Sequence, residues 1–189
     1  GLMTKKEAFS RSGPQKKRMF TIGYSLRSIG TFLQILSNHG VKLLVDVRTI
    51  PKSRHKPEFN KERLSKALQR HGISYMHMKE LGGLRKPLKN SINAAWRNES
   101  FRGFADYMQT KDFAAAIARL ESLASRKTVA VMCAEGNPFR CHRSLIADAM
   151  VVRGYKVYEI TGKNAESVKE HKITGFAKVR GKKITYPQT

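Results

Sequence analysis

The residues best suited to chemistry lie in one short stretch, VMCAEGNPFRCHRS at positions 131–144. An apolar run ends at Cys133, a turn with glycine and proline follows, and Cys141, His142 and Arg143 then occur side by side. A thiol can act as a nucleophile, an imidazole can carry a proton and a guanidinium can bind an anion. This combination favours a functional site that is reactive, metal-binding or anion-binding, and the alternative is two core cysteines beside a charged turn.

The local order of strand, loop and helix favours an anion-binding site. A helix that begins near Arg143 presents free backbone N–H groups and the positive end of its dipole. Arg140 and Arg143 add positive charge, which suits a phosphate or a carboxylate. The same surroundings lower the pKa of a thiol, so Cys141 is the better reactive candidate. Cys133 ends an apolar strand and is expected to be a small buried side chain.

Two other interpretations of the cysteines remain open. The segment from Cys133 to Arg140 resembles the cysteine-loop-arginine arrangement of protein tyrosine phosphatases and rhodaneses. Here, however, six residues separate Cys133 from Arg140 instead of five, and the loop contains one glycine. A zinc site would use Cys133, Cys141 and His142, but the chain has no second pair of ligands such as CxxC.

The acid–base candidates in this stretch are Glu135 and His142. Glu135 is either a general acid or base, or the carboxylate that neutralises Arg140 and Arg143. His142 either transfers a proton or hydrogen-bonds to the backbone at the start of the helix. The sequence leaves both pairs of alternatives open.

Strand-like and helix-like segments alternate along the chain. Apolar runs predict strands at 19–24, 41–47, 73–78, 128–133 and 155–160. Apolar residues at helical spacing predict helices at 29–39, 61–71, 101–125 and 144–153. The alternation predicts a single three-layer α/β domain, in which a mostly parallel sheet of about five strands has helices on both faces. The residues near the C-terminus are compatible with a hairpin.

Polar side chains follow the predicted strands, at the edge where open parallel sheets bind ligands. A carboxylate such as that of Asp46, inside the apolar run VKLLVDV, needs an ionic partner, and Arg48 or a loop arginine can provide it. Polar residues gather after several predicted strands, which predicts a site at this edge of the sheet. The alternative is that they are ordinary polar turn residues. The candidates outside the cysteine stretch are Ser25 after the first strand, Asp46, Arg48, Ser53 and Arg54 around the second, and Arg85 after the third.

The composition is strongly basic. The chain has 37 Lys and Arg against 14 Asp and Glu, which gives a formal net charge of +23. Residues 48–89 alone contain twelve basic and three acidic side chains, so the excess belongs to the fold as well as to its ends. So large an excess predicts a polyanionic partner or substrate, with nucleic acid first and a phosphorylated small molecule second. The alternative is a solvated surface without a partner.

The ends and the cysteine content predict one cytoplasmic domain. Residues 1–18 are polar and basic, and we expect them to be a disordered leader; Gly1 and Leu2 before Met3 are typical of an expression remnant. Residues 19–189 are expected to form the domain together with its basic C-terminal extension. Two cysteines and no signal-peptide pattern favour a reducing compartment, and no apolar run is long enough to cross a bilayer.

Seven blocks of the sequence carry a resemblance to a known family. The blocks are TIGYS (21–25), DVRTIPKSR (46–54), EFN (58–60), GISYMHMKELGG (72–83), WRNESFRGFADYM (96–108), MCAEGNPFRCHRSLIADAM (132–150) and ITYP (184–187). In order and spacing they resemble the family called domain of unknown function 488, over about residues 19–187. The resemblance implies an α/β fold and brings no established reaction. Tyr24 and Glu159 stand where a His is common in that family, and the loop GNPF lacks the tryptophans of many relatives, which weakens a base-stacking role.

These observations together predict an enzyme that acts on a phosphorylated or nucleic-acid-derived substrate at the carboxyl edge of the sheet. One alternative is a non-catalytic nucleic-acid-binding module, and another is an interaction protein whose polar edge is a structural ion-pair network. The sequence identifies no cofactor and favours no set of metal ligands. The candidate chemical groups are Asp46, Glu135, Cys141 and His142, and the candidate anion-binding residues are Ser25, Arg48, Ser53, Arg54, Arg85, Arg140 and Arg143.

Overall fold

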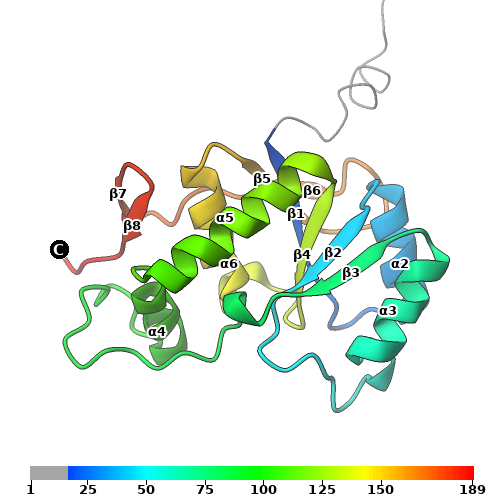
Figure 1. Cartoon of the computed structure of the whole chain (residues 1–189), viewed down its shortest axis with the longest axis horizontal. Helices are drawn as coiled ribbons and strands as arrows, with labels where there is room; N and C mark the ends of the chain where they lie inside the picture. The colour runs from blue at the N-terminus through cyan, green and yellow to red at the C-terminus, as the bar shows by residue number, and fades with distance from the viewer. Residues whose placement is uncertain (1–16) are drawn as a thin grey trace, which may run out of the picture.

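The computed structural model describes residues 17–189 and contains a six-stranded sheet in the order β3-β2-β4-β1-β5-β6 (Figure 1). Five strands are parallel and β6 runs antiparallel to β5. The predicted mostly parallel α/β sheet is therefore confirmed, with β6 as an added edge strand. The strands are β1 (Arg18–Gly23), β2 (Leu43–Asp46), β3 (Ser74–His77), β4 (Val129–Cys133), β5 (Lys156–Ile160) and β6 (Val168–Glu170).

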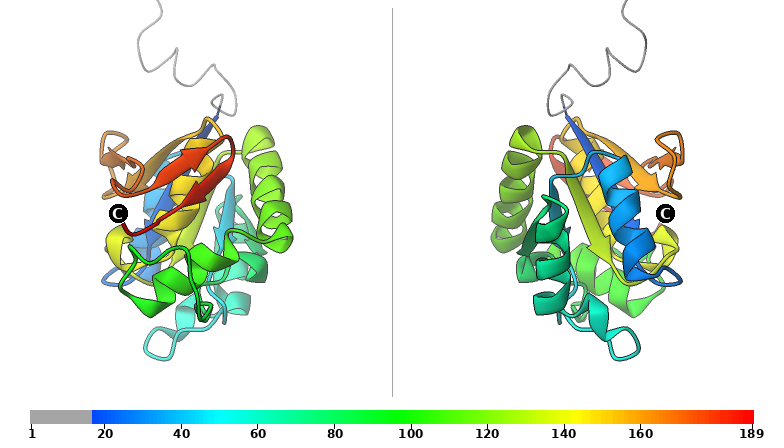
Figure 2. Two further views of the ribbon diagram at one scale, coloured as in Figure 1. Left: turned by 90° about the vertical axis from the view of Figure 1, so that its left-hand side faces the viewer. Right: turned by 90° about the vertical axis from the view of Figure 1, so that its right-hand side faces the viewer.

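Helices cover both faces of the sheet and make the three layers that were predicted (Figure 2). On one face α2 and α3 pack on side chains such as Ile22, Leu44 and Met132. On the other face α4, α5 and α6 pack on side chains such as Val45 and Val131. Alternate residues of each strand therefore point into two separate apolar cores. The helices are α2 (Ile29–Asn38), α3 (Lys61–Arg70), α4 (Glu99–Tyr107), α5 (Lys111–Arg126) and α6 (Arg143–Val152), with short 3-10 helices η1 (Pro57–Phe59), η2 (Lys79–Leu81) and η3 (Pro138–Arg140).

The helix boundaries follow local capping. Ser28 accepts a hydrogen bond from the backbone of Thr31 and begins α2, as its sequence position predicts. The expected single helical stretch at 101–125 is two helices, because the turn at 108–110 breaks it and Thr110 caps the second one. Gly72 ends α3 with a positive φ of 70°, a conformation that favours glycine.

The strand connections create a topological switch point between the neighbouring strands β1 and β4. The chain leaves β1 for α2 on one face and leaves β4 for α6 on the other face. The two loops touch just beyond the strands, where Ser25 N donates to Ala134 O at 2.8 Å. A Cβ atom on Gly23 would lie 1.9 Å from Glu135 O, so this approach requires glycine.

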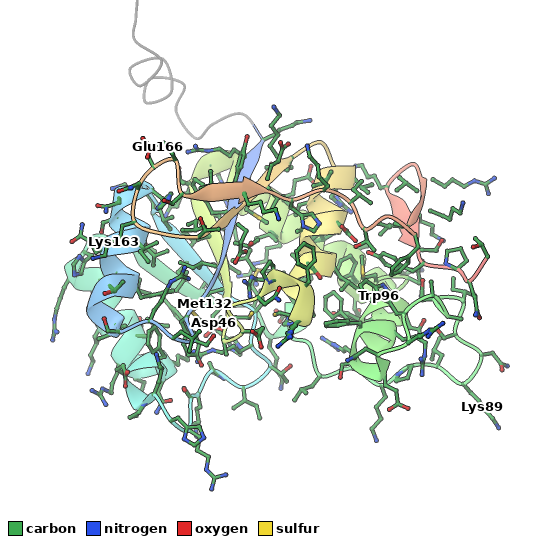
Figure 3. All side chains as sticks on the ribbon, turned by 180° about the vertical axis from the view of Figure 1, so that it is seen from behind. Asp46, Lys89, Trp96, Met132, Lys163 and Glu166 are labelled. Atoms are coloured by element: carbon green, nitrogen blue, oxygen red, sulfur yellow. The ribbon has the colours of Figure 1, made fainter. Side chains whose placement is uncertain are left out.

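The C-terminal segment packs on the domain. It forms the predicted hairpin from β7 (Lys178–Arg180) and β8 (Lys183–Thr185). Tyr186 is fully buried, and its hydroxyl donates to Asp148 of α6 at 2.8 Å. Trp96, before α4, packs edge-on against Tyr186 and lies beside this segment (Figure 3).

The expected leader at 1–18 falls almost wholly outside residues 17–189, which the structure describes; of it, Arg18 already belongs to β1. Within the described range, no helix has the length and apolar character needed to cross a membrane.

Candidate functional site

The two cysteines lie in direct contact at the carboxyl end of β4. Cys133 is the last residue of the strand, and Cys141 comes between η3 and α6. Their Sγ atoms are 2.6 Å apart and both are free thiols, in residues that are 4% and 7% exposed. Cys133 is buried in the α5/α6-side core, as predicted, but it also forms half of a dithiol that sequence reasoning did not foresee.

The surroundings favour a thiolate on Cys141 and a neutral thiol on Cys133. The hydrogen bond shared with Cys133, together with His142 and Arg143, lowers the pKa of Cys141 to about 4. Burial, together with the contact with Cys141, raises the pKa of Cys133 well above its usual range. The backbone N–H of Arg143, at the start of α6, also points to Cys141 Sγ at 3.5 Å. Cys141, rather than Cys133, is therefore the candidate nucleophile of the pair.

His142 is oriented as a partner for Cys141. Its Nε2 atom lies 3.0 Å from Val47 O and 2.9 Å from Leu81 O. Because both carbonyl oxygens only accept hydrogen bonds, Nε2 carries the proton, and Nδ1 remains to face Cys141 Sγ at 3.6 Å. A Cβ atom on Gly83 would lie 2.5 Å from Nδ1, so glycine there leaves room for the ring. The bonds to the backbone thus hold His142 in a position from which it can exchange a proton with Cys141.

Arg143 supports the loop between the cysteines from inside the protein. Its side chain is fully buried and pairs with Glu159 of β5 at 2.6 Å. It also donates to Cys133 Sγ at 2.6 Å and to the carbonyl oxygens of Glu135 and Gly136. Since its N–H groups are occupied in this way, Arg143 acts as a support for the dithiol and its loop rather than as an open anion ligand.

A cleft of about 390 Å³ opens above the dithiol. Cys133, Cys141 and His142 lie along it, and the exposed side chains of Arg140 and Leu84 stand at its border. Its other walls come from the loops after β2 and β3 and from the start of α4, where Phe101 lies. The Cys141 side chain therefore has a cavity beside it that can hold part of a small molecule.

Asp46 and Arg48 lie in a second cluster, on the α2/α3 side of the sheet. Asp46 is fully buried and pairs with Arg48 through several hydrogen bonds, the shortest at 2.7 Å. The hydroxyl of Tyr75 donates to Asp46 at 2.5 Å, and Arg48 also donates to Phe59 O and Tyr24 Oη. Burial and the neighbouring Asp46 carboxylate raise the pKa of Tyr75. The predicted pairing of Asp46 with Arg48 is observed, and it forms a closed network.

The structure thus separates predicted residues that share an edge of the sheet. Asp46 pairs in register with Met132, and the two lie side by side near the end of the sheet (Figure 3). Asp46 and Met132 point to the α2/α3 core, whereas Cys133, the next residue along β4, points to the α5/α6 core. Proximity in the strand register therefore does not place Asp46 against the dithiol.

The remaining predicted anion-binding residues are dispersed. Ser53 accepts a hydrogen bond from Lys56 N and shapes the loop before η1, while Arg54 in the same loop is exposed. Arg85 stacks 3.6 Å above the Tyr107 ring and lines another hollow. Ser25 lies beside the loop after β4, where a Cβ atom on Gly136 would come 3.1 Å from its Oγ. Of the predicted arginines, only Arg48, Arg140 and Arg143 therefore border on the dithiol or its cleft.

Glu135 is exposed at the border of the cleft, and its carboxylate accepts a hydrogen bond from Asn137 N at 3.0 Å. Its backbone carbonyl, not its carboxylate, receives Arg143. The carboxylate that neutralises Arg143 comes instead from Glu159, which the site prediction did not include. A glutamate in the apolar strand sequence YKVYEI was the available signal, since a buried carboxylate needs a cationic partner.

Within residues 17–189, no three His, Cys, Asp or Glu side chains are grouped so that they could hold a metal ion. Comparison with curated proteins and with solved structures gave no match to this chain.

A family model described as "Domain of unknown function DUF488" matches residues 28–150, a range that includes the dithiol, His142, Arg143 and the Asp46–Arg48 pair. The chain therefore belongs to the family of the domain of unknown function DUF488.

Proposed function

We propose that this protein is an enzyme in which Cys141 attacks a phosphorylated or nucleic-acid-derived substrate held in the cleft above the dithiol. The observation that carries the proposal is the Cys141–His142 pair, in which the thiol sulfur lies 3.6 Å from Nδ1 of an imidazole that two backbone carbonyls orient. An activated nucleophile with an oriented base is the arrangement that covalent catalysis requires.

The roles follow from the proton positions. The Cys141 sulfur forms a bond to the electrophilic atom of the substrate, and the bond to the leaving group breaks. The proton that Cys141 has given to His142 passes from Nδ1 to the leaving group. Cys133 and the backbone N–H of Arg143 stabilise the thiolate before the attack. Water then releases the product from Cys141 in a second step.

The substrate class is supported by charge. The net charge of +23 raises the local concentration of anions around the protein. Arg140 places a cation at the border of the cleft itself. The cleft volume of about 390 Å³ fits a mononucleotide-sized group or one unit of a longer chain.

The test is a turnover assay with the full chain on nucleosides, nucleoside monophosphates, p-nitrophenyl phosphate and short single-stranded oligonucleotides, followed by mass spectrometry. We expect turnover of at least one of these compounds and its loss in Cys141→Ser by at least about 100-fold. Ser100→Ala is the matched control, because Ser100 lines the same cleft and has no role in the proposed reaction. Turnover that survives in Cys141→Ser contradicts the proposal.

A second candidate is a non-catalytic nucleic-acid-binding module, which the net charge and the exposed arginines Arg54 and Arg140 favour. This function predicts that affinity for an oligonucleotide falls steeply as the salt concentration rises. Binding with a steep salt dependence, without turnover of any compound in the panel, would favour the module over the enzyme. Binding that does not respond to salt would count against it.

A further inference from the structure

We infer that Cys133 and Cys141 form a redox modification site, at which a hydroperoxide converts the dithiol into a reversible intramolecular disulfide. The inference goes beyond the proposed reaction, because it requires neither a substrate nor turnover. It rests on the contact between the two sulfurs, their positions on fixed elements, and the cleft that reaches them.

The contact geometry favours bond formation between the two sulfurs. Their separation of 2.6 Å exceeds the roughly 2.05 Å of a disulfide bond by only about half an ångström. Cys133 belongs to β4, a central strand paired on both sides with β1 and β2, and Cys141 immediately precedes α6. A disulfide therefore requires the two sulfurs to approach each other by only about half an ångström more.

The two thiols differ in the way that a reactive and a resolving cysteine must differ. Cys141 has His142 Nδ1 and the backbone N–H of Arg143 beside its sulfur, which favours the thiolate that attacks a peroxide. Cys133 lies 2.6 Å from the sulfur on which the product forms, and its burial favours the protonated thiol. Redox-sensitive thiols are typically found as such a pair.

The oxidation needs one external reactant, the hydroperoxide, and it proceeds in two balanced steps. The Cys141 thiolate attacks one peroxide oxygen, the O–O bond breaks, and hydroxide leaves and takes up a proton from solvent, which gives Cys141 sulfenic acid. The Cys133 sulfur then attacks the Cys141 sulfur, the S–O bond breaks, and water leaves as the S–S bond forms. The two thiols are oxidised by two electrons and the peroxide is reduced by two. An external dithiol such as dithiothreitol reverses the process by thiol–disulfide exchange.

A small oxidant can approach the sulfurs from the cleft of about 390 Å³, which both cysteines line. Hydrogen peroxide is small and uncharged, so it needs no cationic ligand there. Oxidation also has a structural consequence for Arg143, which donates to the Cys133 sulfur and to two carbonyl groups of the connecting loop. In the disulfide, the Cys133 sulfur is bonded to Cys141 and becomes a weaker hydrogen-bond acceptor for Arg143. The Cys141 thiolate, which is the proposed nucleophile, is lost at the same time.

The experiment treats the reduced full chain with hydrogen peroxide, blocks remaining thiols with an alkylating reagent and measures the intact mass. The chain has only two cysteines, so an intramolecular disulfide can only be this one. We expect a species lighter than the reduced chain by two hydrogens, resistant to alkylation and restored by dithiothreitol. Two alkylated cysteines after treatment, or a stable oxygen adduct on Cys141 without a disulfide, would overturn the inference.

Two variants assign the roles of the cysteines. In Cys133→Ser we expect sulfenic acid on Cys141, trapped by dimedone, because the resolving thiol is missing. In Cys141→Ser we expect Cys133 to react with peroxide at least about 100-fold more slowly, since it stays protonated. Equal peroxide reactivity in the two variants would contradict the assignment, and circular dichroism checks that each is folded.

The outcome is separable from that of the proposed function. Disulfide formation in a protein that turns over no compound would support the redox site and count against the enzyme. Turnover that depends on Cys141 but continues unchanged after peroxide treatment would support the enzyme and contradict the redox site.

Discussion

Two polar clusters lie at the same edge of the sheet on opposite faces. They differ in whether their polar groups are already paired with one another or border an open cleft. The cluster on the α2/α3 side joins Asp46, Arg48 and Tyr75, and its charged groups are buried and paired. The cluster on the α5/α6 side joins Cys133, Cys141 and His142 beneath an open cleft. Paired charges stabilise a loop, whereas a thiolate with a base and a cavity beside it is equipped for reaction. We therefore regard the first cluster as structural, and the proposed reaction places the chemistry in the second.

The largest effect is expected on folding from the Asp46 cluster. Asp46→Ala leaves the Arg48 guanidinium buried without its carboxylate, so we expect the free energy of unfolding in urea to fall by about 3–5 kcal/mol. Glu170→Ala, which removes the exposed pair with Lys172, is the control and should change it by less than about 1 kcal/mol. If Asp46→Ala is as stable as the control, the Asp46 cluster is not needed for folding, and the contrast between a structural cluster and a reactive one is wrong.

The second effect is the pH dependence of Cys141 reactivity. Because its pKa is lowered to about 4, the thiolate is present above that pH and is lost as the pH falls through it. We expect the rate of Cys141 alkylation by iodoacetamide to stay nearly flat from about pH 5 to 8, where an ordinary thiol gains about tenfold per pH unit. Peptide mapping after timed alkylation measures this rate. A tenfold rise per unit across the range would show that the cluster does not activate the thiol.

A smaller effect is expected from the base. His142→Ala removes the imidazole that faces Cys141, so the alkylation rate at pH 6 should fall by about tenfold or more. His171→Ala is the matched control, because His171 bonds to Asp148 and not to a cysteine. Similar rates in the two variants would leave Cys133 and Arg143 as the sole source of activation.

The smallest effect on folding is expected from the exposed arginines. Arg54→Ala and Arg140→Ala should each change the free energy of unfolding by less than about 0.5 kcal/mol, since both side chains are exposed. If either arginine contacts a phosphate, its removal should reduce the steepness of log affinity plotted against log salt concentration by about one. Fluorescence anisotropy with a labelled oligonucleotide measures this slope. An effect of Arg140→Ala confined to stability would separate the border of the cleft from anion binding.

Local patterns were sufficient for most of the fold. The alternation of apolar runs with amphipathic segments predicted the parallel strands β1 to β5 and helices on both faces, because each element's hydrophobic period reflects the faces that it buries. The hairpin near the C-terminus was also found, whereas β6 was missed, since its three residues, half-buried or exposed, carry little apolar pattern. The break between α4 and α5 depends on a short turn within a sequence that otherwise favours helix.

The sequence by itself determined that Cys141, His142 and Arg143 stand at the start of a helix after a buried strand, and that Asp46 needs Arg48, because these relations are local in the chain. Only the tertiary structure decided that Cys133 touches Cys141, that Glu159 neutralises Arg143, and that Asp46 faces away from the dithiol. Those relations depend on which residue of each strand points to which face and on contacts between distant segments. A shift of one residue along a strand reverses its face, and the strand order brings β5 to Arg143.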